Sequence, residues 1–197
     1  MHRKHTRKEN LISLTLGCLI GVLAGIGHIS SVQQHQTADL LQSETPAAVV
    51  MTYELEPYND PDIPDEIEEA AAAAAEAYDF EPEFLEAIAF YESTYDASAV
   101  NGGCYGLMQV SPYWHGDRME RLGVSDVQIW EAGPNMMVAA DYLRELFGKH
   151  SDPYWVLMTY NGDSNAGAYL KGKAAPSEYA LLVQELTFKL RNKHGKL

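Results

Sequence analysis

Hydrophobic residues recur with helical spacing over most of the chain after residue 63. In residues 82–93, for example, Phe84, Leu85, Ile88 and Tyr91 follow the period of an α-helix. The pattern predicts helices over 64–78, from 82 to about 92, and over 135–147, 153–160 and 177–192, with a short helical turn over 126–130. No stretch alternates as a strand does, so we expect a mainly α fold.

Residues at the expected helix ends support these assignments. Asp62 or Pro64 can open the first helix, and acidic side chains in its early turns suit the helix dipole. The alanine run over 70–75 is a strong helix former. Pro82 suits a first turn, and Gly148 is a stop signal.

The first thirty residues differ from the rest of the chain. Residues 11–27 carry no charge, and a cluster of four basic residues precedes them. This is the pattern of an export signal, and its basic flank favours the cytoplasmic side. We interpret residues 1–30 as a cytoplasmic basic tip plus an uncleaved single-pass membrane anchor, with a cleaved signal and secretion as the alternative. The rest of the chain is then expected outside the cytoplasm.

Residues 31–62 are polar and acidic without a sustained period, and we interpret them as a linker. The region 63–192 is expected to form the folded domain. Only one cysteine, Cys104, follows the export signal, so a fold held by disulfides within that domain is excluded.

The charge distribution narrows the function. The chain has 197 residues, with 28 acidic and 14 basic side chains and a formal net charge of −14. No Lys or Arg lies between Lys8 and Arg118. A general nucleic-acid binder needs a basic face, so nucleic acid is not expected as a partner.

Three short segments carry residues suited to chemistry on sugars. Glu92 lies at the end of an apolar helix, directly after Phe90 and Tyr91 in the sequence. An apolar setting raises the pKa of a carboxyl group, as a general acid requires. The alternative for Glu92 is an ordinary acid at a solvated helix end. The second segment, residues 106–109, follows a glycine-rich loop and ends in Gln109, whose amide can bind sugar groups. The third is Tyr160-Asn161-Gly162, which could equally be a helix stop.

In this order and spacing the segments resemble the lytic transglycosylase SLT domain, which shares the goose-type lysozyme fold. The matches are Glu92-Ser93, Gly106-Leu107-Met108-Gln109, Asn135-Met136 and Tyr160-Asn161. The resemblance covers roughly residues 76–165. It implies a lysozyme-like helical domain that acts on peptidoglycan glycan strands without a cofactor.

The resemblance also implies a mechanism. Glu92 is the acid and then the base that cleaves the bond between N-acetylmuramic acid and N-acetylglucosamine, leaving a 1,6-anhydro sugar. Five residues are expected to bind substrate around Glu92, with Tyr160 orienting its carboxyl group. They are Ser93, Met108, Gln109, Tyr160 and Asn161.

Two other functions stay open at this stage. Asp163 departs from the family pattern, and it or Asp96 is a second carboxylate that could activate water in a hydrolytic muramidase. A catalytically inactive wall-binding or scaffold module is the other alternative.

The remaining candidate residues give weaker signals. No set of His, Cys and acidic residues has the spacing of a metal site. Tyr113, Trp114, Trp130 and Trp155 are expected in the core, although Trp114 follows Gln109 closely enough to line a sugar subsite.

Overall fold

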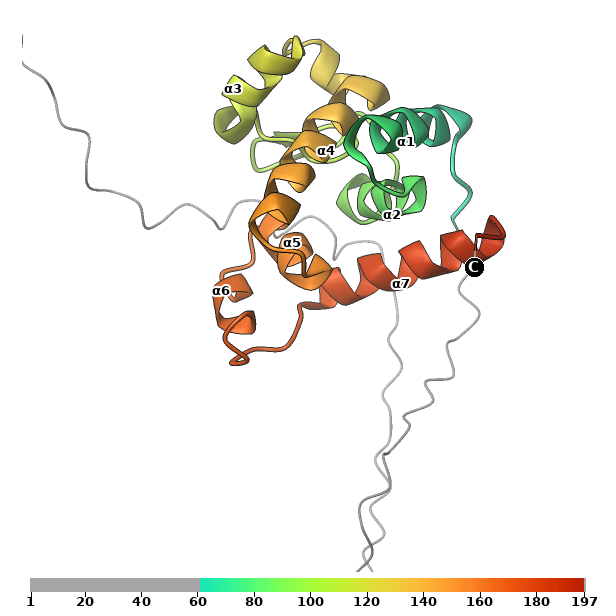
Figure 1. Ribbon diagram of the computed structural model, residues 1–197. Helices are drawn as coiled ribbons and strands as arrows, with labels where there is room; N and C mark the ends of the chain where they lie inside the picture. The colour runs from blue at the N-terminus through green and yellow to red at the C-terminus, as the bar shows by residue number, and fades with distance from the viewer. Residues whose placement is uncertain (1–60, 197) are drawn as a thin grey trace, which may run out of the picture.

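The computed structural model describes residues 61–196 as a helical domain (Figure 1). The predicted anchor and nearly all of the predicted linker lie outside the described residues. Within 61–196, no helix has the length and apolar character of a membrane span. The elements in chain order are α1 (Asp65–Tyr78), α2 (Pro82–Ser93), β1 (Val100–Asn101), β2 (Cys104–Tyr105), α3 (Pro112–Leu122), the 3₁₀ helix η2 (Gln128–Trp130), α4 (Ala132–Lys149), α5 (Pro153–Tyr160), α6 (Ala166–Tyr169) and α7 (Glu178–Lys193).

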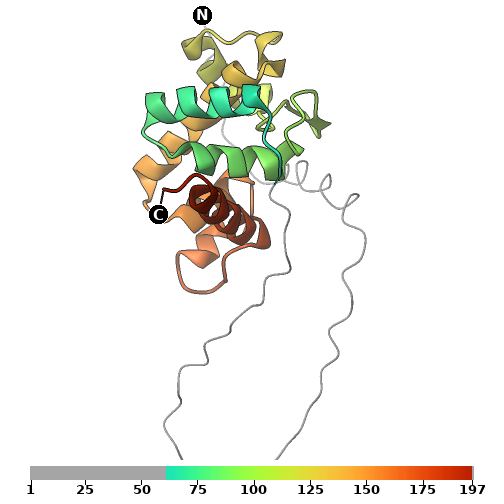
Figure 2. The same cartoon turned by 90° about the vertical axis from the view of Figure 1, so that its right-hand side faces the viewer.

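The helices pack around one hydrophobic core. α1 packs on α4 and on α2, and α2 packs in turn on α7. Figure 2 shows α1, α2 and α7 stacked one below another. The core holds fully buried apolar side chains from each of these helices, such as Ile67, Leu85, Leu143 and Leu186. α2 is therefore covered on two sides, which fixes the helix that carries Glu92.

The prediction of a mainly α fold is confirmed, and the five long predicted helices are present. Local signals explain their boundaries. Pro82 occupies the first turn of α2, and the Asp152 carboxylate accepts hydrogen bonds from the backbone N–H groups of Tyr154 and Trp155 at the start of α5. At the start of α7, the Ser177 hydroxyl accepts a hydrogen bond from the Ala180 N–H.

Four elements differ from the prediction, namely β1, β2, α3 and α6. The expectation of no strands is wrong, because β1 and β2 form an antiparallel hairpin, with two residues in each strand, around Gly102 and Gly103. Strands this short cannot show alternation. The four-residue helix α6 was not predicted either. α3 escaped prediction because Met119 is its only buried residue, so its sequence has no apolar stripe.

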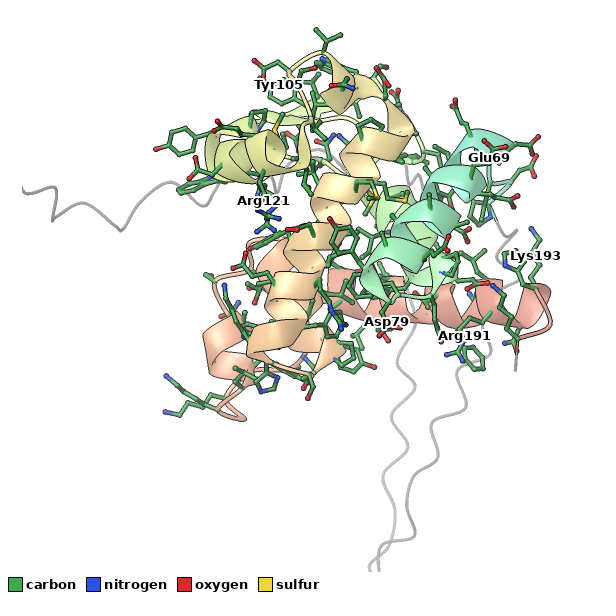
Figure 3. All side chains as sticks on the ribbon, turned by 45° about the horizontal axis from the view of Figure 1, so that its top comes forward. Glu69, Asp79, Tyr105, Arg121, Arg191 and Lys193 are labelled. Carbon is green, nitrogen blue, oxygen red and sulfur yellow. The ribbon has the colours of Figure 1, made fainter. Side chains whose placement is uncertain are left out.

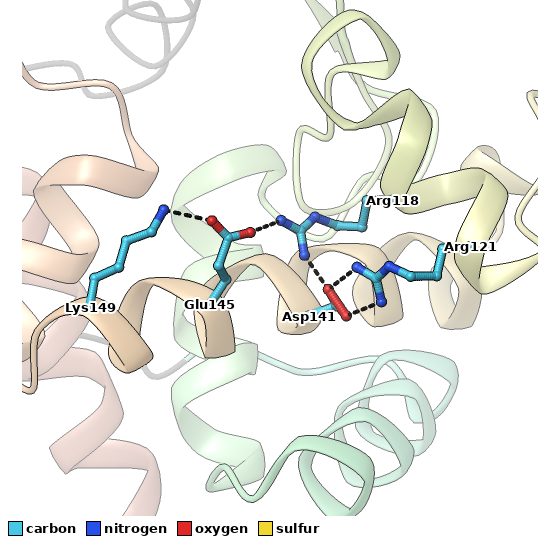
Figure 4. Close-up of polar contacts among 5 residues, drawn as sticks. All are labelled: Arg118, Arg121, Asp141, Glu145 and Lys149. Carbon is cyan, nitrogen blue, oxygen red and sulfur yellow. Dashed lines mark hydrogen bonds and ion pairs between the residues drawn. The ribbon is translucent and has the colours of Figure 1, made fainter.

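Ion pairs join α3 to α4. Arg118 contacts both Asp141 and Glu145, and Arg121 makes two hydrogen bonds of 2.9 and 2.8 Å to the Asp141 carboxylate (Figure 4). Arg121 extends from α3 toward α4 (Figure 3). The hydrogen bonds from Arg121 lower the pKa of Asp141, because they favour its charged form.

Two buried acids lie near the start of α2, where the end of the chain covers them. Glu83 is fully buried, and its Oε1 lies 2.6 Å from Lys196 Nζ and 2.7 Å from His194 Nδ1. Burial alone would raise the pKa of Glu83, but the hydrogen bonds with Lys196 and His194 outweigh it and lower that pKa. Glu86 is only 2% exposed, and its burial, reinforced by the charge of Glu83, raises its pKa to about 7.

The raised pKa of Glu86 predicts a pH-dependent stability. Because the folded protein binds this proton more tightly than the unfolded chain, Glu86 opposes folding increasingly as the pH rises from 4.5, the ordinary pKa, to about 7. Replacing Glu86 by Gln should therefore stabilise the protein at pH 8, by up to about 3 kcal/mol, and have little effect near pH 4. Thermal unfolding at the two pH values measures the difference.

Glu69→Gln is the matched control, since Glu69 is exposed on α1 (Figure 3). It should change stability little at either pH. Equal effects of Glu86→Gln at both pH values would contradict the assignment of a proton to Glu86 at neutral pH.

Candidate active site

Glu92 lies in the last turn of α2, where the chain leaves the helix abruptly. The first two residues after the helix, Thr94 and Tyr95, have φ angles of 56° and 65°. These lie in the left-handed region, which residues other than glycine rarely adopt. The Thr94 N–H bonds back to the carbonyl of Phe90 and closes the helix. These turns send the chain toward the β1–β2 hairpin. Unusual backbone of this kind is common next to functional residues.

The environment of Glu92 favours its protonated form. The side chain keeps partial solvent exposure, but protein atoms surround the carboxyl group closely. This burial raises the pKa of Glu92 to about 7, although hydrogen bonds with Tyr179 and Asn161 act in the opposite direction. Glu92 can therefore both give and take a proton near neutral pH, as a general acid and base must.

Tyr179, in the first turn of α7, holds the Glu92 carboxyl group. Its hydroxyl donates a hydrogen bond of 2.6 Å to Glu92 Oε1. The sequence analysis missed this residue, which lies 87 positions away in the chain. The only available signal was its place just after the Ser177 cap, which predicts a helix start and not a contact with Glu92.

Tyr160 does not have its predicted hydrogen bond. Its hydroxyl donates instead to the backbone carbonyl of Met108, at 2.8 Å. The prediction that Tyr160 orients the Glu92 carboxyl is thus wrong, because Tyr179 donates the hydrogen bond to that carboxyl instead. Tyr160 is nevertheless a neighbour of Glu92, whose charge adds to the effect of burial in raising the tyrosine's pKa.

Met108 contributes its backbone to the site. Its side chain is fully buried, and the expected contact of Met108 with substrate stays a prediction. The Met108 N–H donates a 2.7 Å hydrogen bond to the side chain of Asn135, which is itself fully buried in α4. The amide nitrogen of Asn135 also donates to the carbonyls of Tyr105 and Ile129. One side chain thereby fixes the whole loop after the hairpin.

Gln109 and Ser93 also stabilise this loop. The amide nitrogen of Gln109 donates to the carbonyls of Gly106 and Ala99, at 2.9 and 3.2 Å. Its amide oxygen is buried and accepts no hydrogen bond within the described residues. The Ser93 hydroxyl lies 2.8 Å from the carbonyl of Leu107. Both side chains were predicted to bind substrate, but the Gln109 amide nitrogen and the Ser93 hydroxyl donate hydrogen bonds within the protein.

The structure therefore divides the predicted site residues into two groups. Glu92, Tyr160 and Asn161 meet at one point, together with the unpredicted Tyr179. The other three, Ser93, Met108 and Gln109, build the loop beside that point.

Neither proposed second carboxylate acts on Glu92. Asp96 is exposed and accepts hydrogen bonds from the backbone and hydroxyl of Ser98. Asp163 accepts a 2.7 Å hydrogen bond from the N–H of Asn165. No carboxylate of the described region is among the groups that shift the pKa of Glu92. Residues 61–196 also contain no group of His, Cys and acidic side chains that could hold a metal ion.

The close contact between Gly106 and Asn135 gives a test of this architecture. Gly106 has a φ of 73°, and a Cβ atom there would lie 2.4 Å from the amide nitrogen of Asn135 and 2.7 Å from the carbonyl oxygen of Ile129. Gly106→Ala should therefore lower the free energy of unfolding by at least about 2 kcal/mol. Urea denaturation measures the loss.

Gly103→Ala separates this clash from backbone strain. Gly103 has a similar φ of 88°, but a Cβ atom there would meet nothing within 4 Å. The Gly103 variant should lose clearly less stability. Equal losses in both variants would show that the contact with Asn135 is unimportant.

Comparison with known proteins agrees with this geometry. The structure resembles that of an inactive mutant of the lytic transglycosylase Slt from Pseudomonas aeruginosa, with a TM-score of 0.57 and 18% sequence identity over 65% of this chain and 24% of that one. The chain thus spans about a quarter of that protein, and the likeness shows a shared fold. No curated protein sequence matches the chain. A family model of the transglycosylase SLT domain matches residues 69–181, more than half of the chain. The chain therefore belongs to the transglycosylase SLT domain family.

Proposed function

We propose that this protein is a peptidoglycan lytic transglycosylase that cleaves the bond between N-acetylmuramic acid and N-acetylglucosamine. The observation that carries the proposal is the state of Glu92. Its carboxyl group has a pKa of about 7 and accepts a 2.6 Å hydrogen bond from the hydroxyl of Tyr179. Family membership supplies the substrate class. The predicted export signal is consistent with action outside the cytoplasm.

The reaction needs one group that first gives and then takes a proton. Protonated Glu92 donates its proton to the glycosidic oxygen, and the bond from that oxygen to the muramic acid C1 breaks. N-acetylglucosamine leaves with a free 4-hydroxyl group. The 6-hydroxyl group of the muramic acid then attacks C1, and its proton passes to the Glu92 carboxylate. The products are a 1,6-anhydro sugar and the regenerated acid, with no water consumed.

Tyr179 and Asn161 have a complementary role in this cycle. Their hydrogen bonds favour the charged form of Glu92, whereas burial favours the neutral form. The balance between them keeps the pKa near 7, so that both proton transfers are accessible at neutral pH. Tyr179 also fixes the position of Oε1.

The positions of the other acids favour transglycosylation over hydrolysis. An inverting glycosidase places a second carboxylate to activate water, and a retaining one uses it as a nucleophile. Asp163 and Asp96 are instead occupied by local backbone and hydroxyl groups, and neither affects Glu92.

Replacing Glu92 by Gln tests the assigned acid. The amide cannot donate a proton of comparable acidity, so the release of fragments with 1,6-anhydro ends from purified sacculi should fall by at least about 100-fold, as measured by mass spectrometry. Glu86→Gln is the matched control, because it removes another acid with a pKa of about 7 from the same helix. It should retain activity. Clearance of sacculi by Glu92→Gln at the wild-type rate would exclude Glu92 as the acid. A wild-type protein that binds sacculi but releases no fragments would favour the alternative of a catalytically inactive wall-binding module.

Tyr179→Phe tests the balance that sets the pKa. Loss of the hydroxyl removes a group that stabilises the carboxylate, so the pKa of Glu92 should rise further. The alkaline limb of the pH–rate profile should then move upward by about one pH unit, while kcat falls because the carboxyl group is less well fixed.

Tyr169→Phe provides the comparison. Tyr169 donates a 2.9 Å hydrogen bond to another carboxylate, that of Asp152, outside the site. Its loss should leave the profile in place. An alkaline limb that stays fixed or moves downward in Tyr179→Phe would refute the role given to Tyr179.

A further inference from the structure

Two aromatic side chains at the start of α3 are unusually exposed. Tyr113 is 84% and Trp114 64% exposed, so the prediction that they lie in the core is wrong. Their rings meet edge to face, with centroids 4.7 Å apart and an interplanar angle of 89°. Together they present a contiguous apolar surface to solvent, and exposed patches of this kind commonly mark binding sites.

The fold does not require these aromatic rings. α3 buries only Met119, and its attachment to α4 comes from the ion pairs of Arg118 and Arg121 (Figure 4). Tyr113 and Trp114 lie in the first turn, before both arginines. The pair could therefore be lost without loosening the helix, so packing does not explain it.

A row of aromatic rings begins at the residue after this pair and ends beside the Glu92 carboxyl. His115, the residue after Trp114, packs on Tyr142 with ring centroids 4.6 Å apart. Tyr142 packs on Tyr160 at 5.8 Å, and Tyr160 is the neighbour of Glu92. The row thus runs from the reacting bond across α4 to α3, and the exposed pair lies next to its outer end.

The chemistry of the two side chains suits a sugar ring. Tyr and Trp combine a flat apolar face with a polar group, which matches the apolar C–H faces and hydroxyl groups of a pyranose ring. A glycan strand extends well beyond the bond being cleaved, so distal sugars need a surface on which to lie.

We propose that Tyr113 and Trp114 form a stacking platform for a distal sugar ring of the glycan strand, several ring contacts away from Glu92. The proposal rests on the function proposed above, because it places the same strand along the row from Tyr160 to α3. The platform adds affinity for long strands and takes no part in proton transfer.

Binding without cleavage tests the platform separately from the reaction. The full chain carrying Glu92→Gln is titrated with peptide-free glycan strands and, separately, with intact sacculi. Adding Trp114→Ala should weaken binding to both by about tenfold, the loss typical of a well-packed aromatic contact. Adding Trp114→Phe should restore most of the affinity, because the flat ring is retained.

Phe188→Ala is the matched control, since Phe188 is a 55% exposed aromatic residue on α7, outside the row. It should leave binding unchanged. Unaltered binding in Trp114→Ala would overturn the platform, and so would a loss seen with sacculi but not with peptide-free strands, which would indicate the stem peptide as the occupant. A dependence on Trp114 in a protein whose wild-type form makes no anhydro products would support the platform while refuting the proposed reaction.

Discussion

The hydrogen bond from Tyr179 to Glu92 joins the end of α2 to the beginning of α7, and the site depends on it. These two helices run antiparallel, so their other ends also meet, where Glu83 on α2 contacts His194 and Lys196 just beyond α7. The interface is thus fixed by polar contacts at both ends and by apolar packing between them. A carboxyl group at the end of a helix would otherwise turn toward water and keep an ordinary pKa. Here the geometry of two helices holds it against protein atoms.

The loop after the hairpin supports the site from the opposite side. Asn135 makes two hydrogen bonds to the backbone of this region, at Tyr105 and Met108, and a third to Ile129 in η2. The absence of a side chain at Gly106 allows Asn135 to approach. Ser93 ties the same loop to α2 one residue from Glu92. Several motif residues therefore fix the backbone around Glu92. This arrangement resembles preorganisation in other enzymes, where precise placement of the reacting group depends on the residues behind it.

Much of the fold was predictable because its signals are local. Apolar spacing, Pro82 and Ser177 mark those helices that bury one face. The helix α3 was not predicted because it buries only Met119 and is attached to α4 by ion pairs. The burial that raises the pKa of Glu92 was predictable too, since Phe90 and Tyr91 precede it within one helix. The partner of Glu92 was not, because Tyr179 reaches it only through the packing of α7 on α2. For the same reason the sequence could not show that the Gln109 amide nitrogen and the Ser93 hydroxyl donate hydrogen bonds within the protein, or that Trp114 is exposed.

In the proposed function, a single carboxyl group, that of Glu92, cleaves the glycan without water. Digestion of purified sacculi in water labelled with heavy oxygen tests this most directly, with mass spectrometry of the new chain ends. We expect 1,6-anhydro muramic acid ends that carry no label, because the oxygen at C1 comes from the sugar's own 6-hydroxyl group. Reducing muramic acid ends that carry the label at C1 would contradict the claim and identify the protein as a hydrolase.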